Sequence, residues 1–179
     1  MPEINIRPAV SSDIPTLMAL DHSYVSDYAW QMEIQSEEKN TNVIFREIHL
    51  PRSMRVDYPR PVHNLADTWT RRSGMLVALM DEVVVGYVSI ELGIAPLTAW
   101  ITDLAVLRRM RRQGIGSALV LAAQEWGIQH DCRRLVLEMQ PKNTPAIHLA
   151  QKLGFDFCGY NDRYFANHDI GLFYSRPLR

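Results

Sequence analysis

The stretch in which an apolar run gives way to a helical pattern, residues 100–126, constrains the fold of this chain most strongly. Residues 100–107 are mostly apolar and have the length of a strand, and a short loop with four arginines follows them. Gly114 and Gly116 stand at the end of that loop. Beyond Gly114, apolar residues recur on one helical face: Ile115, Ala118, Leu119, Ala122, Ala123 and Trp126. A strand that passes through a tight turn into a helix is typical of a mixed α/β sheet.

The same turn is suited to hold an anion. The first amides of a helix have no acceptor within the helix, and the helix dipole adds positive potential there. Gly114 and Gly116 allow close approach to the backbone, and no acidic residue lies between Asp103 and Glu125. A plain turn with solvated arginines explains these residues equally well. Two known motifs are excluded, because the loop lacks the Gly-Lys-Ser/Thr of a Walker A loop and Leu119 replaces the third glycine of a dinucleotide fingerprint.

The segments on both sides of this turn also alternate between strand and helix patterns. Residues 4–7 alternate like a short strand, and Ser12 is suited to cap a helix. Residues 29–50 indicate two strands, whereas residues 51–72 hold three prolines and five arginines and indicate a long connection with one helical turn near 66–69. The remaining runs predict a hairpin at 75–80 and 83–90, strands at 134–139, 155–160 and 170–174, and a helix at 146–153 that Gly154 ends.

The composition is that of an ordinary globular protein. Hydrophobic residues make up 47% and charged residues 22% of the 179 residues, so a single domain over residues 1–179 can bury a full core. A net charge of −1 argues against binding of nucleic acid or an anionic membrane through overall charge. Cys132 and Cys158 lack C-x-x-C spacing, no secretory signal is visible, and the longest apolar run, 83–90, is too short to span a bilayer. We therefore expect a cytoplasmic protein without nucleic-acid or membrane partners.

Two motifs together resemble a known family. Residues 111–116, Arg-Arg-Gln-Gly-Ile-Gly, match the R/Q-x-x-G-x-G/A signature of the GNAT superfamily of acyl-CoA-dependent N-acetyltransferases. Residues 143–155 resemble the family's N-x-x-A segment with its closing K-x-G-F. The agreement in order and spacing covers about 80 residues, and the C-terminal part is most similar to the streptothricin acetyltransferase branch. The resemblance implies a GNAT-type α/β fold, a largely antiparallel mixed sheet flanked by helices, with the cofactor in a gap between two central strands.

The resemblance also implies acetyl-CoA as co-substrate, without a metal. Backbone amides of the turn would hold the CoA pyrophosphate, at Arg111, Arg112, Gln113, Gly114, Ile115, Gly116 and Ser117. The preceding strand would bulge and splay from the next one, and the backbone of Leu104, Ala105 and Val106 would pair with the pantetheine arm. Asn143 would contact the cofactor, although a simple helix N-cap explains that residue equally well.

The residues that move protons are the least defined part of this expectation. Many relatives carry a tyrosine where this chain has Ala150, so the acid that protonates the thiolate comes from elsewhere or is not needed. Tyr164 is a substitute by residue type, and a half-buried core tyrosine is the alternative. Asp103 is the first candidate for the base that deprotonates the amine, followed by Glu91. Glu138, inside an apolar strand, is a third candidate or a buried structural partner.

The expected reaction is direct acetyl transfer to an amine of a small molecule such as an antibiotic or polyamine. A protein N-terminus or lysine is the alternative acceptor, and a non-catalytic acyl-CoA sensor is an alternative from another class. A homodimer is also compatible with the sequence. If the connection 51–72 covers the acceptor side, its arginines would favour anionic or zwitterionic amines over polycations.

Overall fold

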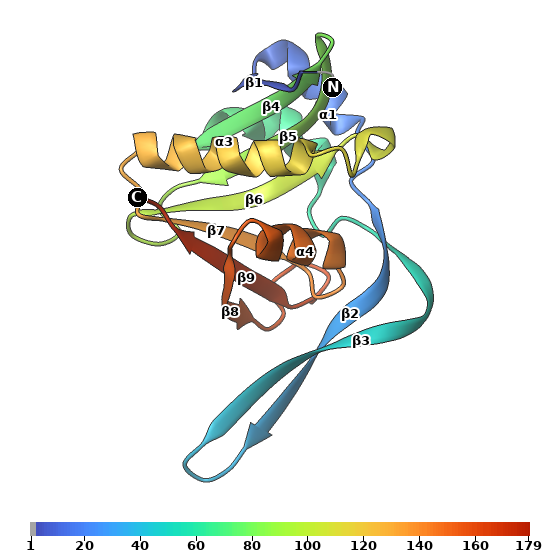
Figure 1. Ribbon diagram of the computed structural model, residues 1–179, viewed down its shortest axis with the longest axis vertical. Coiled ribbons are helices and arrows are strands. Elements are labelled where there is room, and N and C mark those ends of the chain that lie inside the picture. Colours follow the sequence, from blue (N-terminus) through green and yellow to red (C-terminus); the bar gives the residue numbers. More distant parts are fainter. Residues whose placement is uncertain (1–2) are drawn as a thin grey trace.

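The computed structural model describes residues 3–179, which form one large sheet flanked by helices and a separate two-stranded ribbon (Figure 1). The strands are β1 (Asn5–Pro8), β2 (Tyr24–Ser36), β3 (Thr41–Val56), β4 (Gly74–Met80), β5 (Val83–Glu91), β6 (Thr98–Val106), β7 (Arg134–Met139), β8 (Asp156–Asn161) and β9 (Gly171–Pro177). The helices are α1 (Ile14–Met18), α2 (Leu65–Thr68), α3 (Ile115–Gln129) and α4 (Thr144–Lys152), with short 3-10 turns at Ser11–Asp13, Val62–Asn64, Trp69–Arg71 and Arg108–Met110.

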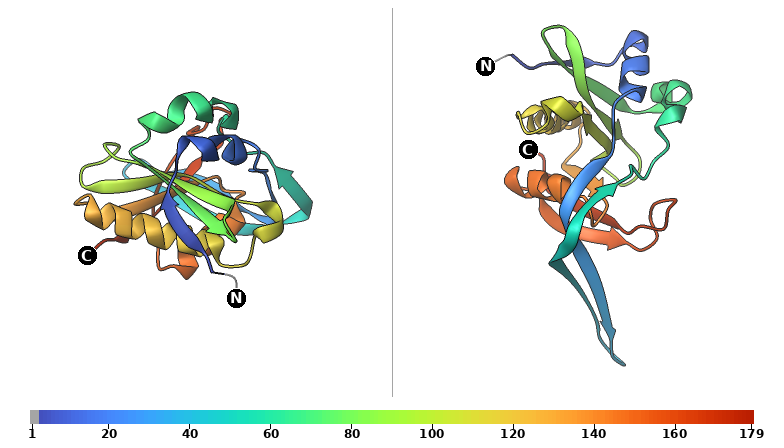
Figure 2. Two further views of the ribbon diagram at one scale, coloured as in Figure 1. Left: turned by 90° about the horizontal axis from the view of Figure 1, so that it is seen from above. Right: turned by 90° about the vertical axis from the view of Figure 1, so that its right-hand side faces the viewer.

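The large sheet has the order β1-β4-β5-β6-β7-β9-β8, and its neighbouring strands run antiparallel except β6 and β7, which are parallel. α3 and α4 cover one face, and α1 and α2 cover the other (Figures 1 and 2). Under α3, side chains such as Leu119 and Ala123 pack with Ile101 of β6, whereas Leu17 of α1 and Leu65 of α2 pack on the opposite face. The expected mixed, largely antiparallel sheet flanked by helices is therefore confirmed.

The two central strands separate part of the way along their length. β6 and β7 are paired only from Thr98 and Arg134 to Ile101 and Leu137. On its other side, β6 contains a bulge, because Asp103 pairs with Ser89 and Ile101 pairs with the next residue of β5, so that Thr102 is an extra residue. The extra residue turns the end of β6 away from β7. A gap opens between these strands beyond Ile101, as the resemblance implied.

The β2–β3 ribbon differs from the sequence-based prediction. We predicted strands only within residues 29–50, yet the ribbon extends from Tyr24, paired with Val56, to a turn at residues 37–40 that lies far from the sheet (Figures 1 and 2). Residues 51–56 thus belong to a strand and not to the long connection. Pro51 is tolerated because residues 50–53 fall in a register shift opposite Asp27, where no ladder hydrogen bond is lost.

The ribbon is anchored to the sheet near its middle. The amide of Trp30 donates to the carbonyl of Pro141 (2.9 Å), and the ring of Phe45 lies 5.3 Å from the rings of both Phe157 and Tyr160 of β8. These contacts hold the middle of the ribbon against β8 and the residues just before α4.

Elsewhere the predicted elements agree with the structure within a few residues, but the first helix is short. A 3-10 turn precedes α1, and Asp13, not Ser12, accepts the hydrogen bond from the Val10 amide (2.8 Å). Gly154 has the left-handed conformation predicted for the residue after α4, with φ of +76°. Within residues 3–179, no helix combines the length and the apolar character needed to cross a membrane.

Candidate functional site

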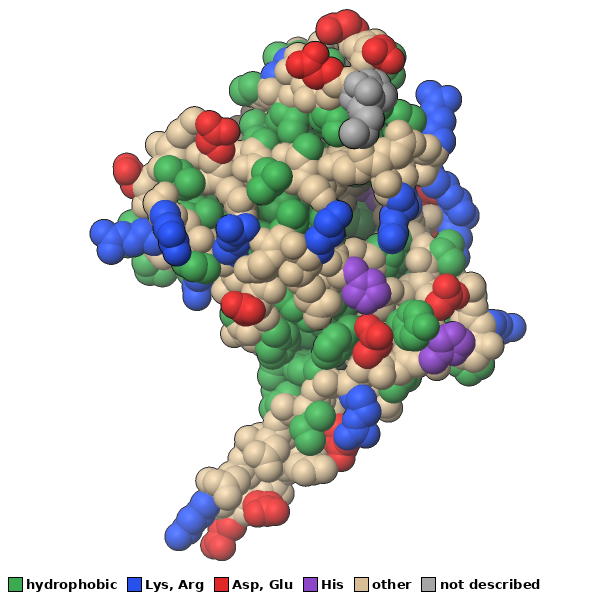
Figure 3. Space-filling view, viewed as in Figure 1, with side chains coloured by type: hydrophobic (Ala, Val, Ile, Leu, Met, Phe, Trp, Pro, Cys, Tyr) green, Lys and Arg blue, Asp and Glu red, His purple; other side chains and the backbone are tan. Residues whose placement is uncertain are grey.

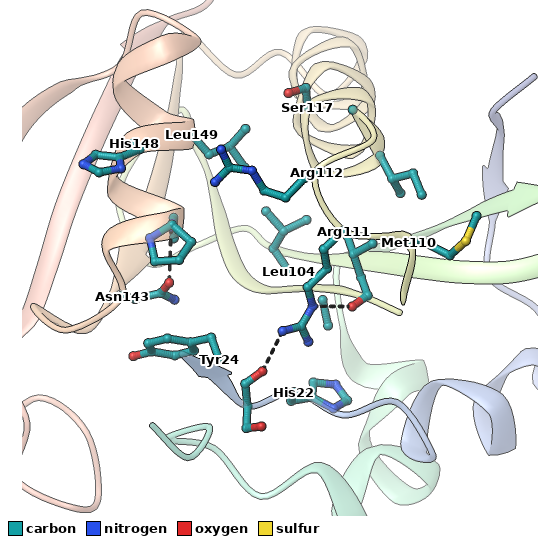
Figure 4. A pocket seen from close by; sticks show the side chains of 18 of the residues that line it. His22, Tyr24, Leu104, Met110, Arg111, Arg112, Ser117, Asn143, His148 and Leu149 are labelled. Carbon is teal, nitrogen blue, oxygen red and sulfur yellow. Dashed lines mark hydrogen bonds between the residues drawn. The ribbon is translucent and has the colours of Figure 1, made fainter. Parts of the chain in front are cut away.

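A cavity of about 400 Å³ lies where β6 and β7 separate, between the start of α3 and the first turns of α4 (Figure 4). Its walls come from five parts of the chain. They are residues 22–24 (His22, Ser23, Tyr24) and Tyr58, the end of β6 and the following loop (Leu104, Ala105, Val106, Met110, Arg111, Arg112), the start of α3 (Gly114, Ile115, Gly116, Ser117), and α4 with its cap (Asn143, Pro145, Ala146, His148, Leu149, Lys152).

The start of α3 presents free backbone amides to this cavity. Gly114 precedes the helix with φ of +87°, a left-handed conformation that favours glycine, and its carbonyl accepts the first helical hydrogen bond from Ala118 (2.9 Å). The amides of Ile115, Gly116 and Ser117 therefore have no acceptor within the helix. On the surface between α3 and α4, Lys and Arg side chains also form a row (Figure 3). The turn is thus suited to bind a phosphate or pyrophosphate.

Arg111 contributes to the cavity in a way that the motif alone does not show. Its guanidinium donates to the backbone carbonyls of Val106 (2.9 Å) and Ser23 (2.8 Å) (Figure 4), and also to that of Asp21 (2.5 Å). Burial lowers the pKa of Arg111 from its ordinary value. The side chain therefore joins the turn to residues 21–23, while its backbone lines the cavity.

The end of β6 presents an open strand edge. On one side, Leu104, Ala105 and Val106 pair with β5. On the side toward β7, no strand in the described part of the chain pairs with β6 beyond Ile101. An extended ligand can add to such an edge through backbone hydrogen bonds.

The structure brings together ten of the eleven residues that the sequence analysis assigned to the cofactor. Gln113 does not line the cavity, because its exposed side chain donates to the carbonyl of Arg109 (3.4 Å). Asn143 lines the cavity, and its Oδ1 accepts from the amide of Ala146 (3.2 Å) as the N-cap of α4, whereas its contact with a cofactor stays a prediction (Figure 4).

Three ring side chains of the cavity wall were missed by the sequence analysis. The Tyr24 hydroxyl donates to Oε1 of the buried Gln140 (2.7 Å), and burial raises the pKa of Tyr24 above its ordinary value. His22 Nε2 lies 2.9 Å from the Tyr87 hydroxyl, and burial lowers the pKa of His22. Tyr58 follows β3, and its ring lies tilted against that of His22, with ring centroids 5.1 Å apart. No local pattern marks these residues, because long-range packing alone brings them to the end of β6.

Asp103 lies behind Tyr58 and not in the cavity wall. Its carboxylate is 5% exposed, accepts hydrogen bonds from the Tyr58 hydroxyl and from Thr102 Oγ1 (3.1 Å), and lies 3.3 Å from Arg72 Nη1. Glu91 shares that guanidinium, with its Oε1 also 3.3 Å from Arg72 Nη1. Burial and the Asp103 charge raise the pKa of Tyr58 well above its ordinary value. Two of the predicted catalytic residues thus form one cluster, which contacts the cavity through Tyr58.

Tyr164, the third predicted catalytic residue, lies in a different cluster. Its hydroxyl donates to Glu138 Oε2 (2.7 Å), which also accepts from Trp100 Nε1 (2.6 Å), and Arg60 forms an ion pair with Glu138 Oε1. Trp100 points to the sheet face away from α3, because its neighbour Ile101 belongs to the core under α3. The Glu138 cluster (Arg60, Trp100, Glu138, Tyr164) therefore lies on the other side of the strand gap from the turn at the start of α3.

Comparisons with known proteins agree with this geometry. The family model described as "Acetyltransferase (GNAT) family" matches residues 42–155. An N-alpha-acetyltransferase of Sulfurisphaera tokodaii is 32% identical over 117 residues, which cover 59% of this chain and 70% of that protein.

Two solved structures are similar over nearly the whole chain. A nourseothricin acetyltransferase superposes with a TM-score of 0.81 at 23% identity, covering 98% of this chain and 99% of that one. A protein of Bacillus anthracis str. Ames, provisionally named a streptothricin acetyltransferase and solved in complex with acetyl coenzyme A, has a TM-score of 0.78 at 18% identity, with 98% and 99% coverage.

Proposed function

This chain belongs to the acetyltransferase (GNAT) family, and we propose that it moves the acetyl group of acetyl-CoA directly to an amine of a small molecule. That it is an acetyltransferase with acetyl-CoA as co-substrate follows from the family. The observation that carries the mechanism is the cavity at the strand gap, where free amides at the start of α3 and the open edge of β6 face the same space.

In this proposal, the cofactor uses the backbone of the chain. The pyrophosphate binds the amides of residues 115–117, and the pantetheine arm adds to β6 along Leu104, Ala105 and Val106. A backbone amide of that edge donates to the thioester carbonyl and stabilises the negative charge that develops on its oxygen. Binding both reactants in one gap makes a covalent enzyme intermediate unnecessary.

Proton transfer is assigned to Asp103 and Tyr58. The amine must lose a proton as its nitrogen attacks the thioester carbon, and the carbon–sulfur bond then breaks to release a thiolate that takes up a proton. The Tyr58 hydroxyl lines the cavity and bonds to the Asp103 carboxylate behind it, so a proton can pass from the amine to Asp103 through Tyr58. Glu91 supports the arrangement through Arg72, which contacts both carboxylates.

The small-molecule acceptor is supported by the similar structures that span the whole chain, whose names refer to nourseothricin and streptothricin. The preference for anionic amines, predicted from the five arginines of residues 51–72, stays a prediction, and three of these arginines are paired with acidic side chains. Arg60 and Arg72 are paired with acidic side chains of the sheet, and Arg55 lies 3.7 Å from Asp21. Because acetyl-CoA is an intracellular metabolite, we place the reaction in the cytoplasm. A homodimer and the absence of nucleic-acid and membrane partners stay predictions.

Acetylation of a protein N-terminus is the second candidate. It is favoured by the N-alpha-acetyltransferase of Sulfurisphaera tokodaii, which is the more similar protein in sequence. The two candidates differ in what must enter the strand gap, a short amine or the end of a peptide chain.

Thiol release from acetyl-CoA measured against a panel of acceptors tests the proposal. The panel contains diamines, amino acid amides, short peptides with free N-termini, and a sample without acceptor. We expect thiol release that depends on a small amine and mass-spectrometric detection of its N-acetyl product. Turnover with peptides alone would favour the second candidate, and tight CoA binding without turnover on any acceptor would overturn the assignment of an amine-acetylating enzyme.

A further inference from the structure

Glu138 is a buried carboxylate that holds a cation supplied by the chain itself. Its side chain has 0% exposure although it lies in the apolar strand β7. Trp100 and Tyr164 both donate to its Oε2 (2.6 and 2.7 Å), which leaves Oε1 to the guanidinium of Arg60. A buried carboxylate needs such partners, because an unpaired charge in an apolar strand is strongly unfavourable.

The rings around this carboxylate complete a pocket for a planar cation. The Arg60 guanidinium carbon lies 5.4 Å from the ring centroid of Phe165 and 6.0 Å from that of Tyr164, within the range of cation–π attraction. On the side of the pocket formed by the sheet, the rings of Trp100 and Phe173 pack against each other, with ring centroids 5.2 Å apart. One carboxylate oxygen and two aromatic faces are the groups by which proteins recognise a guanidinium.

Arg60, whose guanidinium fills this pocket, belongs to a segment that is neither helix nor strand. Residues 57–61 connect β3 to the next 3-10 turn, with Pro59 and Pro61 on either side of Arg60. The Arg60 side chain is still 32% exposed, and its Nε is buried without a hydrogen-bond partner among residues 3–179. The pairing of Arg60 is thus incomplete, so the guanidinium of a ligand can compete with Arg60 for Glu138.

The pocket also lies beside the reacting centre. Leu137, the residue before Glu138, is the last residue of β7 that pairs with β6, so Glu138 stands where the strand gap begins. Tyr58, two residues before Arg60, lines the cofactor cavity and contacts Asp103. A molecule with its guanidinium in the Arg60 position would therefore lie at the strand gap, and an amine at its other end can extend toward Tyr58.

From these contacts we propose that Trp100, Glu138, Tyr164 and Phe165 form an acceptor subsite for a guanidinium group, and that Arg60 occupies it when no acceptor is bound. The acceptor is then an amine that also carries a guanidinium or a closely similar planar cation. The assignment of this subsite to the acceptor rests on the proposed function. Binding of a guanidinium in the pocket, and its selectivity, can be measured without turnover.

The first experiment tests the pocket by chemical rescue in thermal unfolding. Arg60→Ala removes the occupant and leaves Glu138 unpaired, so its melting temperature falls. Millimolar methylguanidinium should raise the melting temperature of Arg60→Ala by several degrees, and the same concentration of methylammonium should raise it much less. Arg55→Ala, which removes an arginine that pairs with the more exposed Asp21, is the matched control and should show no such rescue. If Arg60→Ala does not fold, Arg60→Gln fills the same space without the charge. Equal effects of the two cations on either variant would refute a guanidinium pocket.

The second experiment tests whether the pocket serves the acceptor. Agmatine, putrescine and 5-aminopentanoate present the same primary amine and four-methylene spacer, and end in a guanidinium, an ammonium and a carboxylate. We expect kcat/KM to fall at least tenfold from agmatine to putrescine and further to 5-aminopentanoate. Arg60→Ala should lower the KM for agmatine and leave the dissociation constant of acetyl-CoA unchanged.

The two experiments separate failure of this proposal from failure of the proposed function. An enzyme that acetylates the three amines with equal kcat/KM would overturn the acceptor subsite and leave the acetyltransferase function intact. If no amine supports thiol release, the proposed function and the acceptor role both fail, while rescue of Arg60→Ala by methylguanidinium would still establish the pocket itself.

Discussion

Replacement of Gly116 by valine should separate cofactor binding from folding. Gly116 lies in the first turn of α3, and a Cβ at this position would be 3.4 Å from Leu149 Cδ2, an ordinary contact that needs no rearrangement. The two methyl groups of valine would extend beyond that Cβ into the space in front of the helix amides. The helix itself tolerates the change, because glycine is about 1 kcal/mol less favourable than alanine in a helix and valine lies between them.

The expected loss of affinity follows from the hydrogen bonds that valine would block. A hydrogen bond to a charged group contributes about 1.5–3 kcal/mol, so the loss of one amide–pyrophosphate bond weakens binding roughly 10- to 150-fold. Calorimetric titration with CoA measures this change directly. Gly116→Ala should show a smaller loss, and Leu121→Val, at an exposed position of α3, should bind CoA normally. Unchanged CoA affinity in a folded Gly116→Val protein would refute the assignment of this turn to the pyrophosphate.

Four further substitutions have defined outcomes. Asp103→Asn and Tyr58→Phe should each lower kcat near neutral pH, with little effect on acetyl-CoA binding. The loss of kcat should shrink as pH rises, because more of the acceptor amine is then already neutral. A loss that stays constant across the pH profile would indicate a structural role. Gly86→Ala would place its Cβ 2.8 Å from a backbone carbonyl of β6, so we expect a cost of about 1–3 kcal/mol and a melting temperature lower by several degrees in calorimetry. The Arg7 guanidinium holds the pKa of Asp13 below its ordinary value, so ionised Asp13 stabilises the fold above the ordinary carboxyl pKa and stabilises it less as pH falls. Asp13→Asn should therefore have a lower melting temperature than wild type at about pH 7, and the difference in melting temperature should close toward about pH 3.

The C-terminal part of the chain was predictable because its signals are local. The apolar run 134–139 coincides with β7, and the pair of runs before it forms the β4–β5 hairpin. The turn around Gly114 and the N-cap Asn143 each depend on residues within a few positions of themselves. Most of the residues that the sequence analysis assigned to the cofactor lie at or beside these two helix starts, and ten of the eleven line the cavity.

The acceptor side was not predictable in the same way, because its contacts join distant segments. Residues 51–56 form a strand only through pairing with Tyr24 and its neighbours, about thirty positions earlier. Tyr164 was a candidate proton donor by residue type, but its hydroxyl bonds to Glu138, outside the cavity. Tyr58 was not singled out, since nothing in the sequence around it indicates contact with Asp103. The arginines of this region suggested a positive surface, and only the tertiary structure shows the acids that pair with Arg55, Arg60 and Arg72.

The β2–β3 ribbon leaves the cavity wall with one strand and returns to it with the other, so protection of its amides from solvent exchange differs greatly along its length. At the far end, the turn is closed by the Glu37 amide and the Asn40 carbonyl (2.8 Å), and the strands there are exposed on both faces. Opening of that end breaks only ladder hydrogen bonds and leaves the core intact, so its amide hydrogens exchange through local fluctuations. At the near end, Tyr24 and Val56 are paired and buried, and their amides exchange only when the wall of the cavity is lost. Local stability in the ribbon is thus highest at the cavity and at the Trp30 and Phe45 contacts, and lowest at the exposed turn.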